Sequence, residues 1–367
     1  RHRDHRKARN MIYREAGQFK TTYAADARIF PVAQDRIVFC VLFALLVVVP
    51  PAIGSSYLYD VILFPILGLA LCALGLNILT GYCGQLSFGT GGFMAIGAYA
   101  AFKLAALFPW MNILLIFGMA GLIAAFFGVL VGLSSLRVKG FYLLSATLAL
   151  QFFVEWAIAR MSWLRSHGTT GEGPRDEIFA ILAMGPNAPV ERKYFLMLLI
   201  VTVMTLAAKN LIRGRIGRSW MATRDMDIAA QLIGIRPFAT KLFAFAVSSF
   251  YIGVGGAMNA IVYQGFVDPS AFELFAASFP VLFMIIIGGL GSILGTYLGV
   301  AFMVIVPVAL RNLFPAVGLE IPPHILQHVE FMLFGGLIVL ILIYEPRGLA
   351  GHWHIANEKL RRWPFAH

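Results

Sequence analysis

The sequence predicts an all-α fold, a polytopic transmembrane bundle of about ten helices with both termini in the cytoplasm. Of the 367 residues, 59% are hydrophobic and only 13% are charged, whereas a soluble domain usually carries about 25% charged residues. The mean hydropathy is +0.80. Apolar runs recur from residue 37 to residue 344, as expected of a chain that crosses a bilayer repeatedly.

Most of the expected crossings are single apolar runs between polar loops, at residues 37–53, 112–136, 141–160, 194–211, 242–264 and 331–344. Two longer stretches, 61–108 and 278–310, each hold two crossings. Glycine-rich segments at 81–92 and 288–292 divide them, and the first has five glycines in twelve residues. Glycine disfavours helix. Irregular backbone at membrane depth must be buried in protein or face a watery cavity.

The distribution of basic residues orients the bundle. With the N-terminus inside, the inner segments are 1–36, 81–92, 137–139, 209–241, 288–292 and 345–367. These segments hold 22 of the 29 lysines and arginines, which is the bias that cytoplasmic loops show. The loop at 161–193 has a nearly balanced charge, typical of the outer side. The basic segment 213–241 is therefore expected in the cytoplasm.

Several functional classes are unsupported by the sequence. The net charge of +11 is spread over separate loops, so it does not indicate nucleic-acid binding. Cys40, Cys72 and Cys83 lie in or beside apolar runs without metal-ligand spacing and are interpreted as packing residues. The sequence contains no GxxxxGK[ST] motif, no metal site and no nucleophile–base constellation, so we expect no enzyme and no cofactor in this chain.

Segment 213–241 is the most polar stretch between the first and last crossings. Helix-forming residues run to Ile233, Gly234 suits the left-handed position after a helix, and Pro237 stops continuation. Apolar residues recur at helical spacing, so one face is apolar and the other is charged. The pattern leaves two interpretations equally open, a helix lying on anionic lipid and a helix docking into another subunit. The apolar residues are Met221, Ile228, Leu232 and Ile235.

Polar residues within the apolar runs are candidates for a pathway that a polar solute follows. Hydrogen bonding between helices is the competing explanation for each of them. The candidates are Asn77, Gln85, Ser87, Thr90, Gln151 and Asn259.

Glycines at helical spacing predict close helix packing instead of ligand binding. One pair lies in the run 112–136 and a triplet begins in the segment 288–292. They are Gly128 and Gly132, and Gly291, Gly295 and Gly299.

Five stretches of the sequence form a recognisable set. In order, they are LNILTGYCGQLSFGTGGFMAIGAYAA at 76–101, LRVKGFYLLSATLAL at 136–150, GRSWMATRDMDIAAQLIGI at 217–235, IIGGLGSILGTYLG at 286–299 and YEPRGLAG at 344–351. Together they resemble the permease subunits of branched-chain amino acid ABC importers, of the second permease type in those systems. Permeases for urea and short-chain amides are similar.

The resemblance implies an ATP-driven importer in a bacterial inner membrane. The partners it implies are a sister permease subunit, two cytosolic ATPase subunits that hold ATP and magnesium, and a periplasmic solute-binding protein. A permease domain at 37–345 would lie between cytoplasmic tails at 1–36 and 346–367. The solute would be small and polar, with branched-chain or related amino acids expected first.

In this family the stretch 217–235 corresponds to a coupling helix that docks on the ATPase. The resemblance makes Arg218, Arg224, Asp225 and Asp227 candidate contacts, with Ala229, Ala230 and Gly234 permitting close approach. We expect Met221, Ile228 and Leu232 to pack on the membrane domain, leaving the charged residues for the partner. Where the family often has Arg-Glu-Asn-Glu, this chain has Arg-Asp-Met-Asp at 224–227.

Two other hypotheses remain at this stage. A secondary transporter would use paired broken helices, and the segments 81–92 and 288–295 could form such a pair. A structural or receptor membrane protein is the third. Within the importer family, urea, amides and aromatic carboxylates remain possible solutes.

Overall fold

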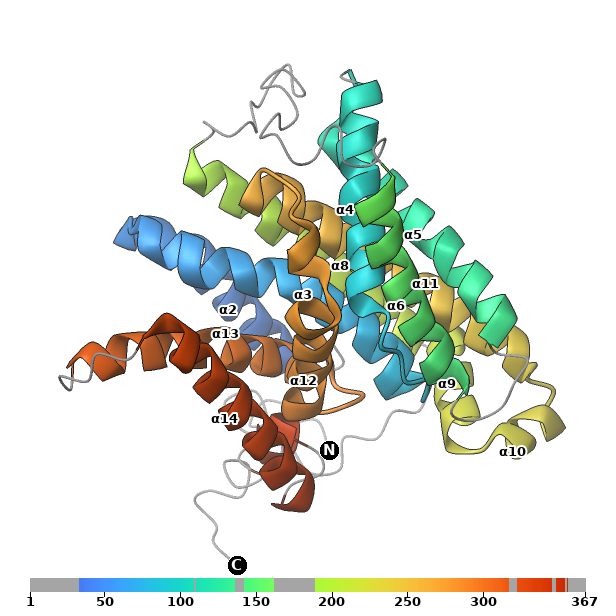
Figure 1. The fold of residues 1–367 in the computed structure, drawn as a ribbon. Coiled ribbons are helices and arrows are strands. Elements are labelled where there is room, and N and C mark those ends of the chain that lie inside the picture. The colour runs from blue at the N-terminus through green and yellow to red at the C-terminus, as the bar shows by residue number, and fades with distance from the viewer. Residues whose placement is uncertain are drawn as a thin grey trace, which may run out of the picture.

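The computed structural model describes residues 33–108, 110–135, 142–161, 189–316, 322–344, 348–353 and 355. Every regular element among these residues is helical (Figure 1). This confirms the all-α prediction. Most of the expected N-terminal tail, the loop at 162–188 and the C-terminal tail beyond residue 355 lie outside the described residues.

Within its described residues, the first half of the chain forms five apolar helical units. The second of these is continuous from η2 through α3 to η3. The bounds are α2 Ala33–Ile53, η2 Leu58–Leu63, α3 Phe64–Asn77, η3 Ile78–Tyr82, α4 Thr90–Leu107, α5 Ile113–Ser135 and α6 Tyr142–Arg160.

The second half adds five apolar units and two short helices between them. These short helices, α9 and α10, lie at one end of the bundle (Figure 1). The bounds are α8 Val190–Arg213, α9 Arg215–Asp225, α10 Asp227–Leu232, α11 Pro237–Met258, η4 Asn259–Gln264, η5 Pro269–Phe272, η6 Leu274–Ser278, α12 Phe279–Gly288, α13 Ile293–Ala316 and α14 Pro323–Tyr344.

Among the described residues, seven helices are long and apolar enough to cross a membrane, and three further apolar helices are shorter. The shorter ones are Phe39–Ile53, Leu274–Gly288 and His328–Ile341. All ten apolar units coincide with predicted crossings. Both glycine-rich divisions lie where predicted. Helical structure ends at Tyr82 and resumes at Thr90, and it ends again at Gly288 and resumes at Ile293.

Helix α11 lies at the centre of the bundle and packs against α3, α4 and α5. Small residues make this possible, because a side chain at Gly97 of α4 would collide with the backbone of Gly253 in α11. A side chain at Gly256 would likewise collide with the backbone of Met94. Such contacts allow two helix backbones to approach closely where lipid offers no hydrophobic driving force.

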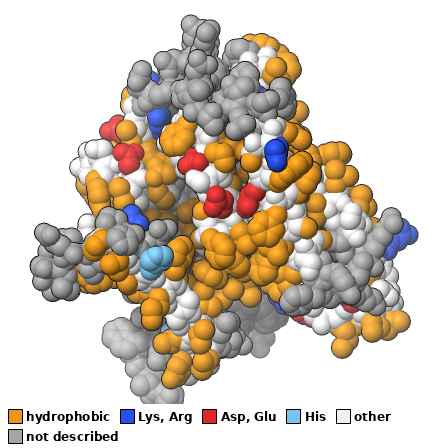
Figure 2. All heavy atoms as spheres, in the orientation of Figure 1, with side chains coloured by type: hydrophobic (Ala, Val, Ile, Leu, Met, Phe, Trp, Pro, Cys, Tyr) orange, Lys and Arg blue, Asp and Glu red, His pale blue; other side chains and the backbone are white. Residues whose placement is uncertain are grey.

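The outer helices present apolar side chains to their surroundings. Exposed large hydrophobic residues occur along α2, α5, α13 and α14, as lipid-facing or subunit-facing surfaces require. Figure 2 shows hydrophobic side chains over most of the visible face, with acidic side chains gathered in its upper half.

Two expectations for segment 213–241 were wrong. The stretch 217–235 is two helices, because Met226 adopts an extended conformation (φ −158°) between α9 and α10. The next crossing begins at Pro237 instead of Leu242. Proline is favoured in the first turn of a helix, where its missing N–H costs nothing, so Pro237 begins α11. Gly234 has φ +87°, the left-handed conformation that the sequence predicted.

We expect Gly97→Val to destabilise the bundle, because its side chain would meet the backbone of Gly253. Overpacking of this kind typically costs about 1–3 kcal/mol. Thermal unfolding of the detergent-purified protein would measure the effect. Gly335→Ala in α14 is the matched control, because a Cβ there meets no atom within 4 Å. Equal stability of the two variants would contradict the close α4–α11 contact.

Candidate functional site

Helix α9 is fixed to the bundle by one buried aromatic side chain. Trp220 of α9 is fully buried, its Nε1 donates to the Thr240 carbonyl at 3.1 Å, and its ring stacks on Phe243 of α11. Gly217 allows α9 to turn back closely on α8, since a side chain there would collide with the Ile212 backbone. The connection between α8 and α11 is therefore a packed structure.

Arg224, at the end of α9, reaches into the first glycine-rich segment. Its Nη1 donates to the Gly81 carbonyl at 2.8 Å. Its Nε and Nη2 contact Asp225 Oδ1 at 2.9 and 2.8 Å. The aliphatic part of the side chain covers Gly84, which has φ +72°. The pair with Asp225 is solvent-exposed and contributes little stability, so the bond to Gly81 is the contact that links two elements.

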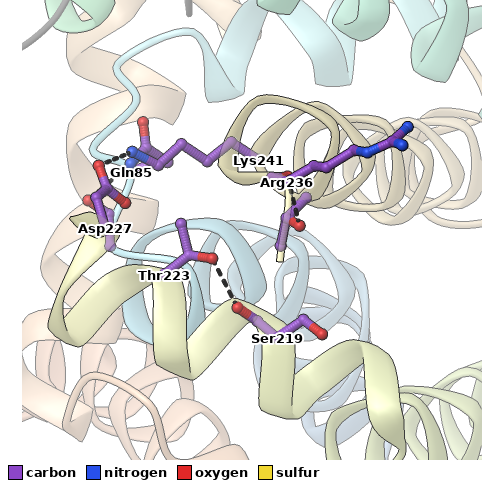
Figure 3. Close-up of polar contacts among 8 residues, drawn as sticks. Gln85, Ser219, Thr223, Asp227, Arg236 and Lys241 are labelled. Atoms are coloured by element: carbon purple, nitrogen blue, oxygen red, sulfur yellow. Dashed lines mark hydrogen bonds and ion pairs between the residues drawn. The ribbon is translucent and has the colours of Figure 1, made fainter. Parts of the chain in front are cut away.

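An ion pair holds α10 to the start of α11. Lys241 Nζ lies 2.6 Å from Asp227 Oδ2, and Figure 3 shows Gln85 beside this pair while Arg236 points away from it. Cys83 lies close enough for both charges to act on its thiol. Burial raises the pKa of the Cys83 thiol to about 12, and the charge of Lys241 only partly offsets this. The thiol therefore stays protonated, in keeping with a packing role.

The two glycine-rich segments meet at Asn77. Its Oδ1 accepts from the Gly291 amide at 2.9 Å, and its Nδ2 donates to the Ser292 carbonyl at 3.0 Å and to Thr296 Oγ1 at 2.6 Å. A side chain at Gly81 would collide with Asn77 and Gly291. We call this region, comprising Asn77, residues 81–84 and residues 289–291, the glycine junction.

All five sequence stretches that carry the family resemblance contribute residues to the glycine junction, to its neighbours, or to residues 85–89 that follow it. Gly348 lies against the backbone of Gly289. The Phe88 amide donates to Thr147 Oγ1 at 3.1 Å. Residues far apart in sequence thus form one region, which the sequence alone could not show.

A second polar network fastens the start of α4. Gln151 of α6 is fully buried. Its Oε1 accepts from the Gly92 amide and from Ser278 Oγ, and its Nε2 donates to the Phe272 carbonyl at 2.7 Å and to Glu155 Oε1 at 2.8 Å. Ser278 Oγ also accepts from the Gly91 amide at 2.8 Å. One side chain therefore joins α4, α6 and the segment 272–278.

The other candidate pathway residues lie in different settings. Ser87 is buried and accepts from the Gly89 amide at 3.3 Å. Gln85 is half-buried near the Asp227–Lys241 pair. Thr90 Oγ1 and Asn259 Oδ1 are buried without a hydrogen-bond partner among the described residues, and Asn259 lies against Gly68. Asn77 and Gln151 make hydrogen bonds between different elements. Their contacts therefore agree with hydrogen bonding between helices, which was the alternative to a solute pathway.

The orientation expected for the coupling stretch was right for Met221, which packs against the core, and wrong for Ile228 and Leu232. Ile228 and Leu232 are 73% and 84% exposed, so they do not pack on the membrane domain. Instead Arg224 and Asp227 turn inward, because both find partners there. Met221 is half-buried, Arg218 and Ala229 are exposed, and Ala230 is buried.

The candidate packing glycines divide into two groups. Gly295 and Gly299 lie where α13 approaches the α12 backbone, and Gly128 lies against Ser249 of α11. Gly132 is buried in α5. Gly291 has φ +74° and precedes α13, so the structure places it in the turn instead of in a helix contact.

Sequence reasoning missed three residues of these networks, namely Thr296, Ser278 and Lys241. Thr296 and Ser278 are polar residues within apolar stretches, which is the signal that identified Asn77 and Gln151. Lys241 was counted only as a basic residue of the cytoplasmic segment.

Fold and site together define a polytopic helical membrane protein with a folded polar connection at one end. Comparison with known proteins gives its family. Residues 57–342 match the family described as branched-chain amino acid transport system permease component, and the chain belongs to that family. No solved structure matches the chain.

Two similar curated proteins are the high-affinity branched-chain amino acid transport system permease proteins LivM of Escherichia coli and Salmonella typhimurium. They are 32% and 31% identical to this chain over 301 residues. Each match covers 75% of this chain and 66% of the relative. A probable branched-chain amino acid transport permease protein LivM of Methanocaldococcus jannaschii is 28% identical over 172 residues, 46% of this chain and 49% of the relative.

We expect Gln151→Leu to destabilise the protein, because it leaves the Gly92 amide and the Phe272 carbonyl without their buried partner. Each unpaired buried group costs about 1–3 kcal/mol. Thermal unfolding in detergent would measure this. Asn312→Ala is the control, because its side chain bonds Tyr57 at an exposed site. A Gln151→Leu protein as stable as the control would show that the network does not fasten α4.

Proposed function

We propose that this chain is the membrane subunit of an ATP-driven importer for branched-chain or related amino acids. Family membership supports this proposal, and so do the names of the two LivM relatives. The chain carries no GxxxxGK[ST] motif, so ATP and magnesium would be bound by separate ATPase subunits. A sister permease and a periplasmic solute-binding protein would complete the assembly in the inner membrane.

The observation that carries the coupling role is the exposed apolar surface of α10. Met226, Ile228, Leu232 and Ile233 are 64%, 73%, 84% and 73% exposed. We call these four residues the α10 apolar surface. They lie on a short connection that projects at one end of the bundle (Figure 1). Exposed apolar clusters of this kind mark interaction sites, and an apolar helix face fitting a groove is a common recognition mode.

Lipid contact is the competing explanation for this surface. Against it, α9 and α10 form one packed unit, which is tied to α11 by an ion pair and by Trp220. A preformed unit suits docking to a protein, because little conformational entropy is lost on binding. The unit also lies among the segments that hold most of the basic residues, which the positive-inside rule assigns to the cytoplasm.

The secondary-transporter hypothesis receives less support. Its possible signature was a pair of broken helices at 81–92 and 288–295. The second segment is bonded to Asn77 at the end of α3, and the first is bonded to α9 through Arg224. Their contact with the cytoplasmic connection suits transmission of movement from an attached subunit.

We expect Ile228→Asp and Leu232→Asp to weaken retention of the ATPase subunits, because each places a charge within the apolar contact. Co-purification of the chain with the ATPase subunits encoded beside it would measure retention. We expect at least a tenfold loss for the double variant. Gln231→Asp is the matched control, because it adds the same charge at an exposed polar position of α10.

Unchanged retention by the double variant would contradict docking through this surface. Failure of the unaltered chain to retain any ATPase subunit would contradict the importer proposal itself.

A further inference from the structure

Arg224 occupies an unusual position for a residue of a docking segment. It lies at the end of α9, next to the α10 apolar surface, yet its guanidinium points into the bundle and donates to Gly81. The Gly291 position is also close, with a Cβ there 3.5 Å from Arg224 Nη1. The Arg224 side chain keeps 38% of its surface exposed, so part of it faces solvent while Nη1 reaches Gly81.

The contact between Arg224 and Gly81 connects α9 to the glycine junction. Gly81 lies against Asn77 and Gly291, and Asn77 is bonded to the residues on both sides of Ile293, the first residue of α13. Gly84, Gly289 and Gly291 have positive φ values of 72°, 115° and 74°. Any displacement of Arg224 would therefore act on the turns before α4 and α13, through groups that are already in contact.

The turn before α4 leads directly to a buried network. Residues 85–89 connect the junction to Thr90, and the first amides of α4 are held by Ser278 and Gln151. A movement at Gly81 is thus only a few residues from the point where α4, α6 and the segment 272–278 are joined. The chain of bonded groups runs from the outside of α9 to the interior of the bundle.

We propose that Arg224 is a positioning residue of the transport cycle, which carries movement of α9 and α10 into the glycine junction and is not itself a contact to the ATPase. This inference rests on the proposed importer function. It assigns the two tasks of the connection to different residues. The α10 apolar surface holds the partner, and Arg224 holds the membrane domain.

The first test replaces Arg224 in the full transporter and measures two quantities, retention of the ATPase subunits and ATP-driven solute uptake. We expect Arg224→Ala to retain the ATPase subunits within twofold of the unaltered chain while uptake falls at least tenfold. Arg224→Lys keeps one donor and should restore part of the uptake. Arg236→Ala is the matched control, because Arg236 is exposed and points away from the Asp227–Lys241 pair (Figure 3).

The second test fixes the contact covalently. A Cβ at Gly84 would lie 3.3 Å from the Arg224 Cβ, close to the separation of about 3.5–4.5 Å found in disulfides. Gly84→Cys with Arg224→Cys should therefore oxidise to a disulfide, in a Cys83→Ala background that removes the neighbouring thiol. We expect the oxidised protein to bind the ATPase subunits but not to transport. Reduction should then raise uptake to the level of the Arg224→Ala variant or above, because it frees the turn to move.

Four results would overturn the inference. Loss of ATPase retention in parallel with uptake in Arg224→Ala would make Arg224 a partner contact. Full uptake by that variant would show that transport does not need the contact between Arg224 and Gly81. Full uptake by the oxidised cysteine pair would show that transport does not need movement at this contact. Failure of the cysteine pair to oxidise would contradict the contact itself, provided that the Gly84→Cys single variant unfolds within a few degrees of the unaltered protein, which excludes strain at this positive-φ position as the cause. If instead the unaltered chain neither retains an ATPase nor shows ATP-driven uptake, the importer proposal fails and not this inference alone.

Discussion

Backbone groups that leave a helix inside a packed bundle must find hydrogen-bond partners within the protein, and the organisation of this bundle follows from that constraint. The chain leaves helical structure after Tyr82 and again after Gly288. Asn77 supplies partners for the second turn, and Gln151 and Ser278 supply partners for the first amides of α4. Buried polar side chains are expensive in such surroundings unless they are bonded in this way.

The glycines of the chain serve this arrangement in two different ways. At Gly84, Gly289 and Gly291 they permit positive φ angles, which other residues adopt only with strain. At Gly97 and Gly256 they permit helix backbones to touch. The first group shapes the turns that meet α9, and the second packs α11 against α4. The closely packed helix α11 therefore lies beside the helices that these turns connect.

Sequence reasoning located the ten apolar units and both glycine-rich divisions, because hydropathy and glycine content report directly on burial and backbone freedom. It could not foresee that Asn77 bonds Gly291, since 214 residues separate them along the chain. It also placed Ile228 and Leu232 inward, because an apolar residue beside a membrane domain is usually expected to pack on it. The inward partners of Arg224 and Asp227 reverse that orientation, and they come from the segment 81–84 and from α11.

The claim on which the account depends is that the α9–α10 connection links this bundle to an outside source of energy. Uptake of labelled leucine into proteoliposomes, containing the full assembly with its solute-binding protein, tests it most directly. The account predicts uptake that requires ATP and persists when proton and sodium gradients are abolished. Uptake by the permease subunits alone, driven by an ion gradient without ATP, would contradict it.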